Sequence, residues 1–137
     1  MTTSKSGKQV LYVQDAQRHT SPIPQGVKAG PFLFLSAIRG IDPETQRVES
    51  DDPEAQSRAL FEVMRRTLAA AGASLQDVVK VAVFMKDLDD RQAFNKVWSE
   101  VWPTDPPARF AVQVLDMGGP GDKSRILVDV TALAPDA

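Results

Sequence analysis

Two charged residues stand where the surrounding pattern favours apolar side chains. Arg109 begins an apolar segment directly after Pro-Pro-Ala, and Asp129 interrupts the apolar run of residues 126–134. A guanidinium on a backbone stiffened by prolines is suited to bind a carboxylate or phosphate through two parallel hydrogen bonds. A carboxylate on a neighbouring strand can move a proton to or from the same ligand. The sequence therefore predicts a site for a small anionic molecule built on Arg109 and Asp129.

A structural role is the alternative for the same two residues. Charged groups that folding removes from water are usually paired, so Arg109 and Asp129 would form an ion pair with each other, or Asp129 would face solvent. Other candidates are weaker. His19 lies in a proline-rich loop and is expected at the surface, and residues 118–121 are glycine-rich but lack the lysine of a phosphate-binding loop.

Composition excludes several kinds of chemistry. The chain of 137 residues contains no cysteine and one histidine, which excludes a disulfide scaffold, a cysteine-ligated zinc or iron–sulfur site and a multi-histidine metal site. A formal net charge of −2 disfavours a nucleic-acid partner.

With 42% hydrophobic and 25% charged residues, the chain is typical of a globular protein, and its length predicts one domain over residues 1–137 with residues 1–8 disordered. We expect a cytoplasmic protein without a membrane partner, because neither a secretory signal nor a long apolar run is present.

The positions of apolar residues predict the elements that must hold these side chains. A helix begins at Pro53, capped by Asp51 or Asp52, and ends at Gly72. A second helix follows a cap at Asp89 or Asp90 and ends before Pro103. Loops are expected at residues 19–26 and 116–125, and strands at residues 10–13, 32–38, 78–86, 108–115 and 126–134.

This order of elements predicts an α+β fold. It is a two-layer sandwich with a mixed sheet and both helices on one face. The run at residues 32–38 is apolar throughout and is interpreted as a strand buried on both faces. Because the chain has no further helix for the second face of the sheet, we expect another subunit to cover it.

Several segments, taken in order, resemble the Rid family of YjgF-type reactive-intermediate deaminases, formerly called L-PSP endoribonucleases. They include Pro-Ala-Arg at residues 107–109 and Val-Asp-Val-Thr-Ala-Leu-Ala at residues 128–134. The others are residues 22–27, 34–36, 41–45, 54–56, 71–80, 83–90 and 94–95. The resemblance spans about residues 20–134 and implies a chorismate-mutase-like (YjgF) fold and a homotrimer with clefts between subunits.

The resemblance also implies an activity. Family members hydrolyse 2-imino acids, the tautomers of enamines, to 2-keto acids and ammonia without a metal or cofactor. Arg109 matches the arginine that holds the substrate carboxylate, and Asp129 aligns with a glutamate that positions water and moves protons. Ser36 and Asn95 match further residues of the substrate-binding cleft.

This sequence departs from the family pattern at several of these positions. Ile23 stands where archetypal members have tyrosine, Ala111 replaces a frequent cysteine, and Asp129 is one methylene shorter than glutamate. We therefore expect a more apolar cleft and a pathway-specific substrate. The main alternative is a binding or regulatory protein that recognises a small carboxylate, such as a keto acid or amino acid, without turnover. Ribonuclease activity is disfavoured by the negative net charge and the single histidine.

Overall fold

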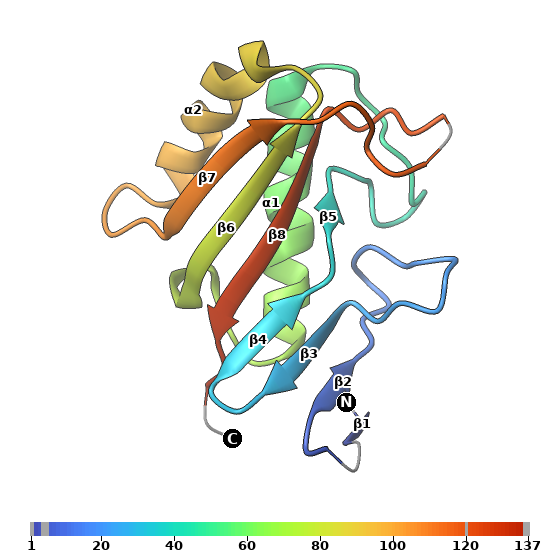
Figure 1. Ribbon diagram of the computed structural model, residues 1–137, viewed down its shortest axis with the longest axis vertical. Coiled ribbons are helices and arrows are strands. Elements are labelled where there is room, and N and C mark those ends of the chain that lie inside the picture. Colours follow the sequence, from blue (N-terminus) through green and yellow to red (C-terminus); the bar gives the residue numbers. More distant parts are fainter. Residues whose placement is uncertain (1, 4–5, 120, 136–137) are drawn as a thin grey trace.

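The computed structural model describes residues 2–3, 6–119 and 121–135 (Figure 1). Its α-helices are α1 (Pro53–Ala70) and α2 (Arg91–Val101). A short 3-10 turn at Leu75–Asp77 follows α1, and another at Leu88–Asp90 directly precedes α2. Its strands are β1 (Thr2–Thr3), β2 (Gln9–Leu11), β3 (Gly26–Ala29), β4 (Phe32–Leu35), β5 (Ile38–Arg39), β6 (Val78–Met85), β7 (Ala108–Gln113) and β8 (Ile126–Leu133).

The strands form one mixed sheet in the order β1-β2-β3-β4-β8-β6-β7, with β5 also paired to β8. The β6–β7 pair is parallel, and the other pairs are antiparallel. The parallel pair follows from α2, which carries the chain back across the sheet between these two strands. Both helices lie on one face of the sheet (Figure 1), so the predicted two-layer α+β sandwich is confirmed.

Helix α1 begins and ends where its sequence predicts. A side-chain oxygen of Asp52 accepts a hydrogen bond from the backbone N–H of Ala55 at 2.8 Å, and Pro53 occupies the first turn. Gly72 takes a φ of 76°, the left-handed conformation that commonly terminates a helix. Between these ends, Leu60 and Met64 face the sheet and are fully buried. Helical spacing and local caps therefore account for this element without reference to the rest of the chain.

The hydrophobic core lies between the helices and the inner face of the sheet. Val81 and Val83 of β6 and Val128 and Val130 of β8 are completely buried, in the alternating pattern of a strand with one covered face. An aromatic cluster closes the core beneath α2 through mutual ring contacts of Phe61, Phe94, Trp98 and Trp102. The two tryptophans are thus packed core residues.

The start of α2 differs from the expected capping arrangement. Asp90 occupies the N-cap position, but its carboxylate makes no capping hydrogen bond. It instead accepts two hydrogen bonds from Arg125, from Nε at 2.9 Å and from Nη2 at 3.2 Å. A charged bidentate partner outcompetes the backbone N–H groups for this carboxylate.

The sequence predicted that residues 32–38 form one strand buried on both faces. The structure instead divides this segment into two strands. Strand β4 ends at Leu35, and Phe32 and Phe34 remain 39% and 47% exposed while Leu33 and Leu35 are buried. After a break, β5 turns toward α1, and a side chain at Gly40 would lie only 2.2 Å from the backbone oxygen of Gln56. The chain therefore passes close to α1 directly after β5, at a position where only glycine fits.

The N-terminal part contains more strand than expected. Thr2 and Thr3 form β1, which pairs with β2, whereas residues 1 and 4–5 of the segment predicted to be disordered lie outside the described residues. The expected loop at residues 19–26 ends in β3, which pairs with both β2 and β4. The short sequence Gly-Val-Lys-Ala carries little strand signal, so the pairing depends on its neighbours.

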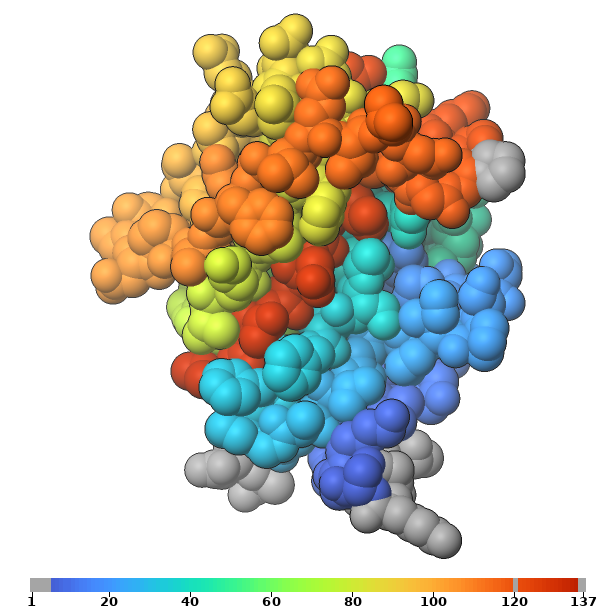
Figure 2. Space-filling view, in the orientation of Figure 1, coloured from blue at the N-terminus to red at the C-terminus, as the bar shows by residue number. Residues whose placement is uncertain are grey.

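The outer face of the sheet is open in the single chain. Figure 2 looks onto this face, where side chains of β4, β6, β7 and β8 lie side by side without a covering helix. Its exposed apolar residues include Phe32, Phe34, Phe110, Val112 and Leu133, each at least 39% exposed. We call this set the open apolar face. In the described part of the chain, no helix combines the length and apolar character needed to cross a bilayer.

Candidate functional site

Arg109 is held in place by α2. Its Nη1 donates a hydrogen bond to Oδ1 of Asn95 at 2.6 Å, and its Cζ lies 4.9 Å from the ring centroid of Trp98 and 5.7 Å from that of Phe94. Cation–π contacts of this kind hold a guanidinium without neutralising it. Partial burial, followed by the charge of Arg91, lowers the pKa of Arg109 below its usual value.

The sequence builds this arrangement locally. Asn95 and Trp98 are three residues apart and share one side of α2, which faces the beginning of β7. The chain leaves α2 at Pro103 and enters β7 through Pro106 and Pro107, so Arg109 comes early in that strand. No carboxylate in the described residues lies within 4.0 Å of its nitrogens. The result is a positioned cation without an acidic partner.

Asp129 lies on the other face of the sheet. It is opposite Ala82 in the β6–β8 register, whereas Arg109 is opposite Val81 in the β6–β7 register. Successive residues of a strand point to opposite faces, so Arg109 projects toward the helices and Asp129 toward the open apolar face, where it is exposed. The alternative of an ion pair between these two residues is therefore wrong, and a small ligand cannot contact both within one chain.

Ser36 and Ile23 lie together, apart from Arg109. The Ser36 hydroxyl donates to the carbonyl oxygen of Pro24 at 2.6 Å, and its backbone N–H donates to that of Gln25 at 3.0 Å. Ser36 therefore anchors the loop that carries Ile23, whose side chain is 44% exposed. The hydroxyl oxygen can still accept a hydrogen bond from a ligand.

Ala111 is two residues beyond Arg109 on β7. It therefore shares the strand face of Arg109 and packs against the core. The structure thus brings Arg109, Asn95 and Ala111 together in one group. It places Ile23 and Ser36 in a second, which we call the Ile23 group.

Tyr12 is a candidate that sequence reasoning missed. It is 62% exposed and lines a cavity of about 350 Å³ together with Ile23 and His19. It is the only tyrosine of the chain, and this is the one feature of the sequence that could have drawn attention to it as a site residue. Burial, with a contribution from the charge of Arg39, lowers the pKa of His19 below 6.5, so His19 is neutral at pH 7. Arg18 lines the same cavity, so the surface around Ile23 is apolar and polar with one positive charge.

The described residues do not contain a group of three or more His, Asp or Glu side chains that could hold a metal ion. The chemistry available from the groups described above is capture of an anion by Arg109 and proton transfer by the Asp129 carboxylate. These are the functions for which the sequence singled out the two residues.

The fold and the placement of these groups define a YjgF-like α+β domain. The family model described as Endoribonuclease L-PSP matches residues 14–136, and the chain belongs to this family, which includes the Rid proteins. The sequence-based assignment to the family is therefore confirmed.

The similar proteins include relatives named only as RutC family proteins and two with deaminase names. A RutC family protein of Pyrococcus horikoshii is 37% identical over 127 residues, covering 93% of this chain and 97% of the relative. Reactive Intermediate Deaminase A of Arabidopsis thaliana is 32% identical over 114 residues, covering 83% of this chain and 61% of the relative. The 3-aminoacrylate deaminase RutC of Acinetobacter baylyi is 32% identical over 107 residues, covering 78% of this chain and 85% of the relative.

A solved structure agrees with the fold. Escherichia coli TdcF, crystallised with bound serine, superimposes with a TM-score of 0.83 at 26% identity, covering 93% of this chain and 99% of the neighbour. The relatives and this neighbour support a Rid-family deaminase class for the chain, and they leave its substrate open.

Proposed function

We propose that this protein hydrolyses a 2-imino carboxylic acid, or its enamine tautomer, to the 2-keto acid and ammonia. The observation that carries the proposal is the uncompensated guanidinium of Arg109, which Asn95 and Trp98 hold in position. A carboxylate is the complementary ligand for such a group. The similarity to deaminases, and to a neighbour that binds serine, supports an amino-acid-like substrate.

The chemistry requires little from the protein. A protonated imine carbon is electrophilic, so water can attack it once both are positioned. The water oxygen forms a bond to this carbon while Asp129 takes one proton from the water and passes it to the nitrogen. The C–N bond then breaks and ammonia leaves with the bonding electron pair, while the hydroxyl oxygen gives its remaining proton to Asp129 and forms the C=O bond. Arg109 would hold the substrate carboxylate throughout, and no electron acceptor or metal is required.

We propose that the complete site forms between subunits of a homotrimer. Arg109 and Asp129 project from opposite faces of one sheet, so a second copy is needed to bring an Asp129 to a given Arg109. Two features of the single chain support association: the open apolar face, and the outer edge of β7, which ends the sheet order. The Ile23 group would then form an apolar wall of the cleft and favour substrates with an apolar side chain.

A coupled assay tests the activity. An amino-acid oxidase generates imino acids from leucine, methionine, phenylalanine and alanine, and semicarbazide competes with the protein for each imine. We expect the wild-type protein to reduce semicarbazone formation, most strongly for the larger apolar side chains. The Arg109→Ala variant should not reduce it. Arg65→Ala, which removes an exposed arginine from α1, is the matched control and should behave as wild type.

A non-catalytic carboxylate-binding protein is the second candidate. The separation of Arg109 from Asp129 within one chain favours it, because a single chain presents the anion anchor without the proton-transfer group. In that case calorimetry would detect saturable binding of keto acids that depends on Arg109, while the coupled assay would show no turnover of any imine.

A further inference from the structure

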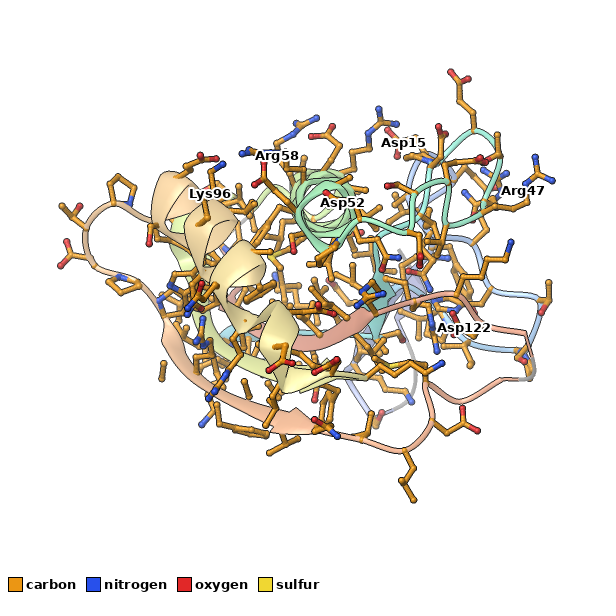
Figure 3. All side chains as sticks on the ribbon, turned by 90° about the horizontal axis from the view of Figure 1, so that it is seen from above. Asp15, Arg47, Asp52, Arg58, Lys96 and Asp122 are labelled. Carbon is orange, nitrogen blue, oxygen red and sulfur yellow. The ribbon has the colours of Figure 1, made fainter. Side chains whose placement is uncertain are left out.

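A second cationic cavity lies far from Arg109. It has a volume of about 370 Å³ and is lined by Arg18, Arg39, Arg47 and Lys123, with Ile41 and Val48 as apolar surface. In Figure 3, Arg47 and Asp122 lie on the side of the molecule away from Lys96 of α2. Because Arg109 is attached to α2, this cavity is separate from it, although it shares Arg18 with the cavity lined by Tyr12 and Ile23.

The cavity carries an excess of positive charge. Arg39 is paired with Asp122, from Nε to Oδ2 at 2.8 Å, and Arg47 Nε lies 3.6 Å from a carboxylate oxygen of Glu49. For Arg18 and Lys123, no carboxylate among the described residues lies within 4.0 Å. Two cations thus remain without an acidic partner in a chain whose formal net charge is −2.

Hydrogen bonds between segments hold the walls of the cavity in place. Arg39 donates through Nη2 to the carbonyl oxygen of Met117, and its backbone N–H donates to Oε1 of Gln17 at 2.8 Å. On the opposite wall, the Gln46 amide donates to the carbonyl oxygens of Ala16 and Pro43, and accepts from the backbone N–H of Arg18 at 2.7 Å. A cavity whose walls are cross-linked in this way is largely preformed, which lowers the entropic cost of binding.

We propose that this cavity binds the phosphate group of a small phosphorylated molecule. Guanidinium groups match the oxygens of a phosphate in pairs, and a dianion fits several cations better than a single carboxylate does. The volume is within the range of about 300–1,000 Å³ that is usual for small-molecule sites, which leaves room beyond the phosphate itself. Ile41 and Val48 would contact the carbon skeleton of the ligand, and Gln17 its polar groups.

Calorimetric titrations at constant ionic strength test the proposal, with inorganic phosphate, glycerol phosphate and neutral glycerol as probes. We expect saturable binding of glycerol phosphate with a Kd of about 1 mM or tighter, weaker binding of phosphate, and none of glycerol. Replacing the two cations that have no acidic partner, Arg18→Gln with Lys123→Gln, should raise the Kd at least about tenfold, because two charged contacts are lost.

Two controls separate a defined site from general charge and from the imine site. Arg65→Gln with Lys86→Gln removes one arginine and one lysine from exposed positions outside the cavity, and should leave the Kd unchanged. Arg109→Ala should also leave it unchanged. The proposal is overturned if neither phosphate probe binds saturably, if both double variants weaken binding equally, or if Arg109→Ala abolishes it.

Discussion

Two partly buried arginines beside α2 differ in what surrounds their charge. Arg125 makes a bidentate pair with Asp90, whose side chain is 7% exposed, and this carboxylate raises the pKa of Arg125. Arg109 contacts a neutral amide and aromatic rings, and partial burial lowers its pKa. The first arrangement is complete within the chain and stabilises the fold. The second leaves a charge that a ligand can neutralise, and this difference supports the role proposed for Arg109.

The largest expected effect is on stability, at the complete pair. Arg125→Ala leaves Asp90 buried without its partner, and breaking such a pair costs about 3 kcal/mol. For a domain of this size we expect the Tm to fall by roughly 10 °C. Thermal unfolding followed by circular dichroism measures it. Replacing both partners, Arg125→Met with Asp90→Leu, should recover much of the loss. An unchanged Tm for Arg125→Ala would contradict the stabilising role of the Arg125–Asp90 pair.

At Arg109 the expected effect is on activity. Arg109→Ala removes a bidentate charged contact with the substrate, and we expect kcat/KM to fall about 100-fold, which corresponds to about 2.7 kcal/mol. The Tm should change little, because no carboxylate is left unpaired. Steady-state kinetics and thermal unfolding of the same preparation test both statements. Full activity in this variant, or a Tm loss as large as that of Arg125→Ala, would contradict the functional assignment.

Mixing two inactive variants tests whether the site is shared between subunits. Arg109→Ala and Asp129→Asn should each be inactive alone. If a cleft takes Arg109 from one subunit and Asp129 from its neighbour, random reassembly of equal amounts restores about a quarter of wild-type activity, since each intact residue is present with a chance of about one half. Activity after co-refolding and gel filtration provides the measurement. No recovery in mixed trimers would contradict a cleft that takes Arg109 and Asp129 from two subunits.

Asn95 should have a smaller effect, because it positions Arg109 and is neutral. Asn95→Ala removes the 2.6 Å hydrogen bond to Nη1, while the ring contacts of Trp98 and Phe94 remain. We expect KM to rise about tenfold, equivalent to about 1.4 kcal/mol, with a smaller change in kcat. Asn95→Asp should be more damaging, since its carboxylate would neutralise Arg109 and compete with the substrate. A kcat effect larger than the KM effect in Asn95→Ala would argue against a positioning role.

The smallest effect is expected at an exposed ion pair. Hydrogen bonds from Arg65, and secondarily Arg66, lower the pKa of Glu62 from 4.5 to about 2. A pKa lowered by folding stabilises the native state above pH 4.5, and this contribution is lost as the pH falls toward 2. Because the Glu62 side chain is 42% exposed, Glu62→Gln should cost under about 1 kcal/mol at pH 7. Denaturant unfolding at several pH values should show the difference from wild type disappearing near pH 2.

Much of the fold follows from local signals in the sequence. The caps and apolar spacing of α1 predicted its ends, and the Pro-rich connection predicted the strand that begins near Arg109. Strand β3 and the break before β5 could not be predicted in this way. β3 depends on pairing with β2 and β4, and the segment after the break pairs with β8 and passes close to Gln56 of α1.

The same distinction between local signals and contacts of distant segments applies to the candidate site. Residue types, spacing and short-range propensities are enough to predict the family, the α+β class and the unusual position of Arg109. They do not predict the surroundings of each charge: the Asn95 contact of Arg109, the Arg125 partner of Asp90, and the placement of Asp129 on the outer face of the sheet. Strand register and helix packing select these neighbours, and both depend on residues that are far apart in the chain.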